Sequence, residues 1–337
     1  MLRARFFLAA VAVVAILSLR LRVQAFKSHG RATHQIKIIR PAQEGFMITR
    51  ARFIVGGITT ALSPLVVSPS PAKAELDREV ASLFRKADLE ASQGNIDNAL
   101  QLYNKVVKLA PDFPNGWSNR GNMQVAKGNL EKAREDYSKA LAIGLNDKDD
   151  WVVHLNRGTV YLALGQAGEA LEDFDAAAAS PGGRRNALVL QNRAQALERA
   201  GRWAEAEADY GKALQSAPGE VRPYWLRLAL VLLQLGRPAD GLALARRVLA
   251  RYPGELEARA AVAALTHGPD GMGYAQAVKV WSYKEGEVTE EGLRLITSRE
   301  YLENTLHWPP LAVKAFTSFL QTYKKDQVAT LKEQKLI

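Results

Sequence analysis

Three asparagines recur along the chain with the same neighbours, and their carboxamides are the groups best placed to do chemistry. Asn119, Asn156 and Asn192 begin the tripeptides Asn-Arg-Gly, Asn-Arg-Gly and Asn-Arg-Ala, at spacings of 37 and 36 residues. A carboxamide both donates and accepts hydrogen bonds, so a row of them can bind the N–H and C=O groups of an extended peptide backbone. Such a row on one face of a fold is suited to non-covalent binding of a polypeptide segment, with little dependence on that segment's own side chains.

The residue types that catalysis and metal binding need are scarce and scattered. The chain has no Cys, which excludes disulfides, thiolate metal sites and Cys nucleophiles. After residue 74 there are three His, namely His154, His267 and His307, and they lie far apart in segments of different kinds. The glycines of residues 267–273 follow no strand signal, so they do not predict a phosphate-binding loop. We expect no enzymatic activity, no metal and no cofactor, and we expect His154 to be a hydrogen-bonded core residue.

The elements that must position the asparagines come from an internal repeat with a period near 34 residues. Five copies begin at residues 80, 114, 151, 187 and 222 and align without gaps through their middle. Each copy predicts two helices joined by a turn, and each turn carries a glycine that can take a left-handed conformation: Gly94, Gly128, Gly165, Gly201 and Gly236.

Small and aromatic residues also recur at fixed places in the copies. Small residues are expected where the two helices of a copy approach closely: Ala87, Gly121, Gly158, Ala194 and Ala229 on the first helices, and Ala99, Ala133, Ala170, Ala206 and Gly241 on the second. Aromatic residues are expected to fill the space toward the next copy: Tyr103, Tyr137, Phe174 and Tyr210. The fifth copy departs from this pattern, because Ala245 replaces the aromatic residue.

These features resemble tetratricopeptide repeats. The resemblance implies an all-α fold in which residues 75–254 form a right-handed superhelix of helix-turn-helix pairs, with the first helices lining a concave groove. It also implies which polar side chains face that groove, and the candidates for binding a peptide are Asn119, Asn122, Asn156, Gln191, Asn192 and Gln195. The alternative is that the asparagines serve repeat packing, since Asn-Arg-Gly is frequent in this family. A clamp for a chaperone's C-terminal carboxylate is not expected, because Phe84 and Asp88 stand in the places of its Lys and Asn.

Residues 255–337 are expected to close the array. They contain a degenerate sixth helix pair and then further helices, the last of which begins at Pro309-Pro310. Its apolar residues at helical spacing predict a cap over the end of the core: Ala312, Ala315, Phe316, Phe319 and Tyr323. The alternative is that Trp281, Trp308 and the last helix dock a partner.

The first 74 residues are expected to be a leader in three parts. Residues 1–25 predict a signal peptide with a basic start, a short apolar run and cleavage between Ala25 and Phe26. Residues 26–52 are basic and nearly free of acids, which is typical of a transit peptide; the alternative is a disordered basic linker. Residues 53–74 form a second apolar run that follows basic residues, as in a signal peptide, and they predict cleavage between Ala74 and Glu75.

Two export signals that flank a basic segment resemble the leaders of thylakoid-lumen proteins in algae with complex, red-lineage plastids. In those leaders a Phe commonly follows the first cut, and Phe26 is in that place. The usual Pro is missing, since Lys27 and Ser28 follow, so the match rests on Ala25 and Phe26. The resemblance implies a plastid transit segment, a thylakoid-lumen transfer signal and a location in the lumen. The alternative is a secreted or endomembrane protein that is cleaved only after Ala25.

The charge of the chain is confined to this leader. The formal net charge is +10, but residues 1–74 hold 11 of the 45 Lys and Arg and one of the 35 Asp and Glu. Residues 75–337 therefore hold 34 of each and have no net charge. A nucleic-acid partner is not expected, because the part that would be matured lacks a basic surplus to bind phosphates.

The combined expectation is a non-enzymatic scaffold that binds a protein or peptide partner in the plastid thylakoid lumen. Its mature form is expected to be soluble or peripheral to thylakoid membrane complexes, and to assist their assembly, stability or repair. That role follows from fold and location by analogy. The alternatives are a permanent structural subunit of a membrane complex, and a secreted or endomembrane adaptor.

Overall fold

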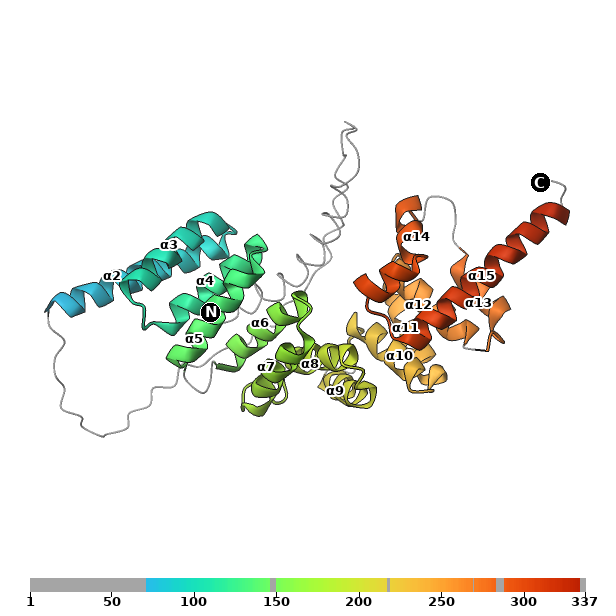
Figure 1. The fold of residues 1–337 in the computed structure, drawn as a ribbon, viewed down its shortest axis with the longest axis horizontal. Helices are drawn as coiled ribbons and strands as arrows, with labels where there is room; N and C mark the ends of the chain where they lie inside the picture. The colour runs from blue at the N-terminus through green and yellow to red at the C-terminus, as the bar shows by residue number, and fades with distance from the viewer. Residues whose placement is uncertain (1–70, 146–149, 217–218, 269, 283–287, 334–337) are drawn as a thin grey trace, which may run out of the picture. The chain divides into compact units, whose positions relative to one another are not determined.

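The computed structural model describes residues 71–145, 150–216, 219–268, 270–282 and 288–333, which fold as helices joined by short turns (Figure 1). The predicted signal peptide and transit segment, with Ala25 and Phe26, lie outside the described residues. The predicted cut between Ala74 and Glu75 lies in the first turns of a helix that starts at Pro71. Among the described helices none is long and apolar enough to cross a membrane.

The chain divides into two compact units between residues 146 and 147. Unit 1 contains two antiparallel helix pairs: α2 (Pro71–Ser92) with α3 (Ile96–Leu109), and α4 (Pro114–Lys127) with α5 (Leu130–Ile143). They are the first two predicted copies, and α3 packs against α4. The division thus falls inside the predicted array, between its second and third copies.

Unit 2 contains the remaining copies. Its helix pairs are α6 (Asp150–Ala163) with α7 (Ala167–Ala179), α8 (Ala187–Arg199) with α9 (Trp203–Ser216), α10 (Tyr224–Gln234) with α11 (Pro238–Arg251), and α12 (Leu256–His267) with α13 (Tyr274–Trp281). The α12–α13 pair confirms the degenerate sixth copy. The helices α14 (Glu290–Ile296) and α15 (Pro310–Glu333) follow, with the π-helical turn η1 (Tyr301–Thr305) between them. The all-α repeat fold is therefore confirmed.

The five repeat glycines lie where the sequence predicted a left-handed turn. Their φ angles run from 71° to 82°. In each case the N–H of the following residue donates to the carbonyl five residues earlier, at 2.8–2.9 Å. This bond satisfies a carbonyl at the end of the first helix and reverses the chain into the second helix. The same glycine turn thus sets the antiparallel geometry of every pair.

Small residues pack inside the pairs as expected, and aromatic residues contact them there. Phe174 and Tyr210 are at most 1% exposed. The Phe174 ring lies against Gly158 on the first helix of its own pair, and Tyr137 lies against Gly121 in the same way. Tyr210 also joins a cluster with Leu228 and Val231 of the next pair. The aromatic residues therefore hold each pair together as well as filling the space toward the next one.

Replacing Gly158 with Val is expected to lower the free energy of unfolding by about 1–3 kcal/mol, because the core there has no spare volume. A Cβ atom at this position would lie 2.6 Å from Cε1 of Phe174, whose ring is fully buried. Denaturant unfolding would measure the loss. The control is Gly211→Val in α9, where nothing lies within 4 Å of the added Cβ. Equal effects for the two variants would contradict close packing at Gly158.

The C-terminal helix α15 closes the core of unit 2. It packs against α12 and α13, as Figure 1 also shows. The predicted cap residues Ala312, Ala315, Phe316 and Phe319 are at most 1% exposed. Trp281 and Trp308 are 2% and 4% exposed and belong to the same hydrophobic cluster. The alternative that these two tryptophans dock a partner is therefore wrong, because their rings are already buried within the chain.

Candidate functional site

In unit 1 the predicted residues Asn119 and Asn122 lie on α4, half-buried and hydrogen-bonded to neighbouring helices. Nδ2 of Asn119 donates to Oδ1 of Asp88 on α2 at 3.2 Å. Oδ1 of Asn122 accepts from the hydroxyl of Tyr137 on α5 at 2.7 Å. Burial raises the pKa of Asp88, although bonds from Tyr103 and Asn119 oppose that shift. Both carboxamides therefore contribute to packing within unit 1.

In unit 2 the predicted residues occupy α6 and α8. Asn156 on α6 is 8% exposed, so most of its carboxamide is covered. Gln191, Asn192 and Gln195 lie half-buried on α8. Residues three and four apart share one side of a helix, so Gln195 is close to both Gln191 and Asn192. The structure thus gathers three half-buried carboxamides on one side of α8.

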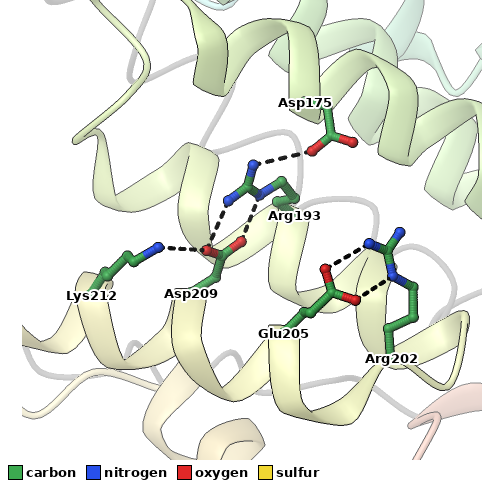
Figure 2. Close-up of polar contacts among 6 residues, drawn as sticks. All are labelled: Asp175, Arg193, Arg202, Glu205, Asp209 and Lys212. Carbon is green, nitrogen blue, oxygen red and sulfur yellow. Dashed lines mark hydrogen bonds and ion pairs between the residues drawn. The ribbon is translucent and has the colours of Figure 1, made fainter.

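The arginine that follows each asparagine makes a contact that the sequence analysis missed. Arg193 on α8 donates Nε and Nη2 to the two carboxylate oxygens of Asp209 on α9, at 2.6 and 2.9 Å (Figure 2). Arg120 and Arg157 pair in the same way with Asp136 and Asp173. Three Arg–Asp pairs at a constant spacing of 16 residues were a visible signal for this contact.

Each of these pairs links the two helices of one repeat, and the arginines Arg120 and Arg193 also bond to the second helix of the preceding repeat. Asp209 is 3% exposed at its side chain and Arg193 23%. Arg193 also donates to Asp175 on α7, at 3.1 Å, so it joins two successive pairs (Figure 2). His154 is half-buried, and its Nδ1 lies 2.7 Å from Oδ1 of Asp173, so it is hydrogen-bonded as expected. The Asn-Arg tripeptides therefore serve packing through their arginines.

The next first helix, α10, binds a segment of the chain's own C-terminal part. We call Leu306–Leu311 the C-terminal segment; its residues before Pro310 have no regular secondary structure. Nη1 and Nη2 of Arg227 donate to the carbonyls of Leu306 and His307, at 2.6 and 2.8 Å. Oε1 of Gln234 accepts from the N–H of Leu311 at 2.9 Å. Polar side chains of a first helix thus bind the backbone of a polypeptide segment.

A buried ion pair holds Arg227 in place for this contact. Arg227 pairs with Glu198 on α8, and Glu198 also accepts from the hydroxyl of Tyr210. Burial disfavours the charge on Arg227, but the Glu198 carboxylate outweighs it and holds the Arg227 pKa above its ordinary value. Burial, with the Glu198 charge, raises the pKa of Tyr210, which stays protonated and donates. Arg227 therefore remains a cation whose other N–H groups point at the C-terminal segment.

His307, the second residue of the C-terminal segment, has a conformation that is unusual for a residue other than Gly. Its φ is 49°. Burial, with the charges of Arg199 on α8 and Arg227 on α10, lowers its pKa to about 4, while a backbone hydrogen bond with Glu303 opposes the shift. Glu198 balances Arg227 nearby. Protonation of His307 would therefore add a third cation to this cluster.

Acid is expected to loosen the C-terminal segment. An exposed His has a pKa of about 6.5, so protonation favours the released form as the pH falls from 6.5 toward 4, and the docked form keeps its full stability above 6.5. Hydrogen exchange of the Trp308 and Leu311 amides would measure release. The reference is His307→Asn, because Asn tolerates a positive φ. The ratio of the exchange rate in the unchanged chain to that in His307→Asn should rise by up to about tenfold for each unit by which the pH falls in that range. A ratio that is independent of pH would contradict this role of His307.

The polar side chains on the first helices of unit 2 form what we call its first-helix face: Asn156 on α6, Gln191, Asn192, Gln195 and Arg199 on α8, and Arg227 and Gln234 on α10. Within the described residues no group of three His, Asp or Glu could hold a metal ion. A shallow hollow in unit 1, lined by residues 94–98, Ala126 and Lys127, contains none of the predicted residues. The first-helix face is therefore the candidate site in unit 2.

Comparisons with known protein families match much of the described helical part. Models of the tetratricopeptide repeat match residues 84–148, 187–220 and 224–254. Tetratricopeptide repeat protein 36 from Bos taurus is 31% identical over 128 residues, which cover 37% of this chain and 67% of that protein. The match thus extends over two thirds of a curated protein built from this repeat.

Other relatives are longer proteins of which this chain spans a small part. Protein O-mannosyl-transferase TMTC3 from Homo sapiens is 26% identical over 152 residues, which cover 44% of this chain and 15% of that protein. The DnaJ homolog subfamily C member 7 homolog from Schizosaccharomyces pombe is 29% identical over 171 residues, 47% of this chain and 35% of that protein.

Among solved structures, YrrB, described as a TPR protein with an unusual peptide-binding site, is similar to this chain. It is 21% identical with a TM-score of 0.48, and the match covers 56% of this chain and 94% of that one.

Proposed function

Because the chain belongs to the tetratricopeptide repeat family, we propose that it is a non-enzymatic scaffold that binds a polypeptide segment on the first-helix face of unit 2. One observation carries this function: Arg227 and Gln234 on α10 already bind the backbone of the C-terminal segment. The third, fourth and fifth copies have the same helix-turn-helix structure, so α6 and α8 carry side chains at the positions that correspond to Arg227 and Gln234.

The register of the copies identifies the binding residue on α8. The fourth and fifth copies begin 35 residues apart, at 187 and 222. Asn192 is therefore the counterpart of Arg227, the residue that donates to two backbone carbonyls. Asn192 is half-buried, and the structure shows no hydrogen bond from its carboxamide to any described residue. It can thus donate to a carbonyl and accept from an N–H of a bound segment, as Gln191 and Gln195 beside it can.

A capture experiment tests this function. The full chain with both Asn192→Ala and Gln195→Ala is expected to retain less of its polypeptide partner from a lysate of its own cells than the unchanged chain does. Asn156 is left intact because it is buried and its loss would also disturb packing. The matched control changes the exposed residues Glu172 and Lys212 on the second helices α7 and α9 to Ala. Unchanged capture by the α8 variant would refute the binding role of this face.

We further propose that the protein works in the plastid thylakoid lumen and assists the assembly, stability or repair of photosynthetic membrane complexes. What supports this location is the order of the leader segments, 1–25, 26–52 and 53–74, and Phe26 after the first expected cut. A cut before Glu75 would keep the folded core, since Val80 is the first residue described as buried. The N-terminal residue of the protein purified from its cells tests the location: Glu75 is expected, and Phe26 would refute it.

A permanent peripheral subunit of a membrane complex is the second candidate, and one feature favours it. Beyond its buried stripe α15 continues as an exposed helix over residues 324–330, where Val328 is 38% exposed. Such an extension could dock onto a larger assembly, as the sequence alternative for the last helix supposed. Co-purification with a membrane complex through a high-salt wash would favour the permanent subunit, and release in salt would favour transient binding.

A further inference from the structure

We propose that Arg199 is a second binding residue on α8 and that the bound segment presents a carboxylate to it, from an Asp or Glu side chain or from a chain terminus. This assignment rests on the proposed function and adds the chemistry of the partner. Arg199 was not among the residues that the sequence analysis selected. The observations that point to it are its register, its missing acceptor and the charge around it.

The register of Arg199 matches a residue that already binds a segment. On α10, Arg227 and Gln234 lie seven residues apart, which is about two helical turns, so they share one side of the helix. Both bind the backbone of the C-terminal segment. On α8 the residues 35 positions earlier are Asn192 and Arg199. A segment that lies along α8 as the C-terminal segment lies along α10 would meet Asn192 first and Arg199 two turns later.

The guanidinium of Arg199 lacks the partner that comparable arginines have. Arg120, Arg157, Arg193 and Arg227 each pair with a carboxylate. Arg199 donates Nη1 to the carbonyl of Leu162 on α6 at 2.7 Å, but its buried Nε has no acceptor, and no ion pair with Arg199 is present among the described residues. Its Nη2 makes no hydrogen bond to a described residue and is not among the buried unpaired atoms, so Nη2 is the N–H group that a partner's carboxylate can reach.

The charge around Arg199 also favours an anion. Its neighbour Arg227 is paired with Glu198 and is also close to the charge of Glu257, and His307 is held neutral. Arg199, by contrast, forms no ion pair with any described residue. Burial, with the charge of Arg227, lowers the pKa of Arg199, and the charge of Glu198 opposes this shift without cancelling it. A carboxylate from the partner would stabilise the charged guanidinium of Arg199, whereas a neutral or basic group would not.

The competing explanation is that Arg199 only caps the end of α6. Leu162 is in the last turn of α6, where cations commonly bind free carbonyls. A cap uses Nη1 and gives the partner no preference for acidic residues. Binding experiments with defined peptides therefore distinguish the two roles.

The experiment selects random 12-residue displayed peptides on the immobilised full chain and then measures the affinity of an enriched peptide. We expect one acidic position to be enriched. Changing that Asp or Glu to its amide should weaken binding to the unchanged chain about 10- to 100-fold, the range for a hydrogen-bonded charge pair. The same change should have almost no effect on Arg199→Gln, and Arg199→Lys should retain part of the preference. Arg202→Gln, which changes an exposed arginine just before α9, is the matched control.

Each result decides between the two roles. Two results would overturn the role of Arg199 and leave the scaffold function intact. One is that the enriched peptides have no acidic position. The other is that the change from acid to amide weakens binding to Arg199→Gln as much as it weakens binding to the unchanged chain. No enrichment over an empty support would overturn both. The exchange of acid for amide in the peptide leaves the chain unaltered, so it tests the carboxylate even where Arg199→Gln destabilises the fold.

Discussion

Replacing Asp209 with Ala is expected to lower the free energy of unfolding by about 2–4 kcal/mol, which makes it one of the two largest effects in this chain. The Asp209 carboxylate is 3% exposed at its side chain and accepts two hydrogen bonds from Arg193. Its removal leaves the Arg193 guanidinium half-buried with only Asp175 as a carboxylate partner (Figure 2). The expected value is below that of a fully buried pair because Arg193 keeps some contact with water. Denaturant unfolding followed by circular dichroism measures it.

The control for Asp209 lies one turn away on the same helix. Glu205 also pairs with an arginine through two hydrogen bonds, from Nε and Nη2 of Arg202 (Figure 2). Both partners are exposed, so water already screens the pair, and Glu205→Ala should leave the unfolding midpoint unchanged. If the two variants lose equal stability, the Arg–Asp pairs do not hold the repeats together.

Replacing Phe316 with Ala is the second large effect, with an expected loss of about 3–5 kcal/mol in the C-terminal repeats. Phe316 is fully buried, and its ring centroid lies 5.2 Å from that of Trp281 and 5.8 Å from that of Trp308. The variant leaves a cavity where α15 packs against Trp281 of α13 and against Trp308. Terminal repeats depend on a cap for their stability, so α12 and α13 should lose protection from hydrogen exchange before α6 and α7 do.

Val328→Ala in the same helix provides the comparison for Phe316. Val328 is 38% exposed and lies beyond the capped region, so exchange in α12 and α13 should stay as in the unchanged chain. If α12 and α13 are equally protected from exchange in the two variants, α15 does not stabilise the C-terminal repeats.

The sequence predicted the repeat fold because its determinants lie within one copy. A glycine with positive φ ends each first helix of the five copies, and a small residue lies against the ring of Tyr137 and of Phe174, so both signals recur with the period. The division between residues 146 and 147 was not predicted, because it depends on contacts between copies. A signal for it exists, since the spacing of 37 residues between the second and third copies is the largest of the four.

The candidate site was predicted less well, because its contacts join distant parts of the chain. The asparagines were selected by their shared register, but Asn119 is bonded to Asp88, and Asn156 is nearly covered. The bonds from Arg227 to the C-terminal segment join residues 79 and 80 positions apart, which no repeat pattern reveals. Whether α8 binds a partner stays a prediction.

Photo-crosslinking from α8 tests that prediction most directly. The chain has no Cys, so Gln195→Cys provides one attachment point for a benzophenone label, and Lys212→Cys on α9 provides the control. Each labelled chain is irradiated with the peptides enriched by display selection. If the first-helix face is the binding site, the label at position 195 crosslinks peptide several-fold more than the label at position 212. Equal crosslinking from both positions, or crosslinking from position 212 alone, would contradict it.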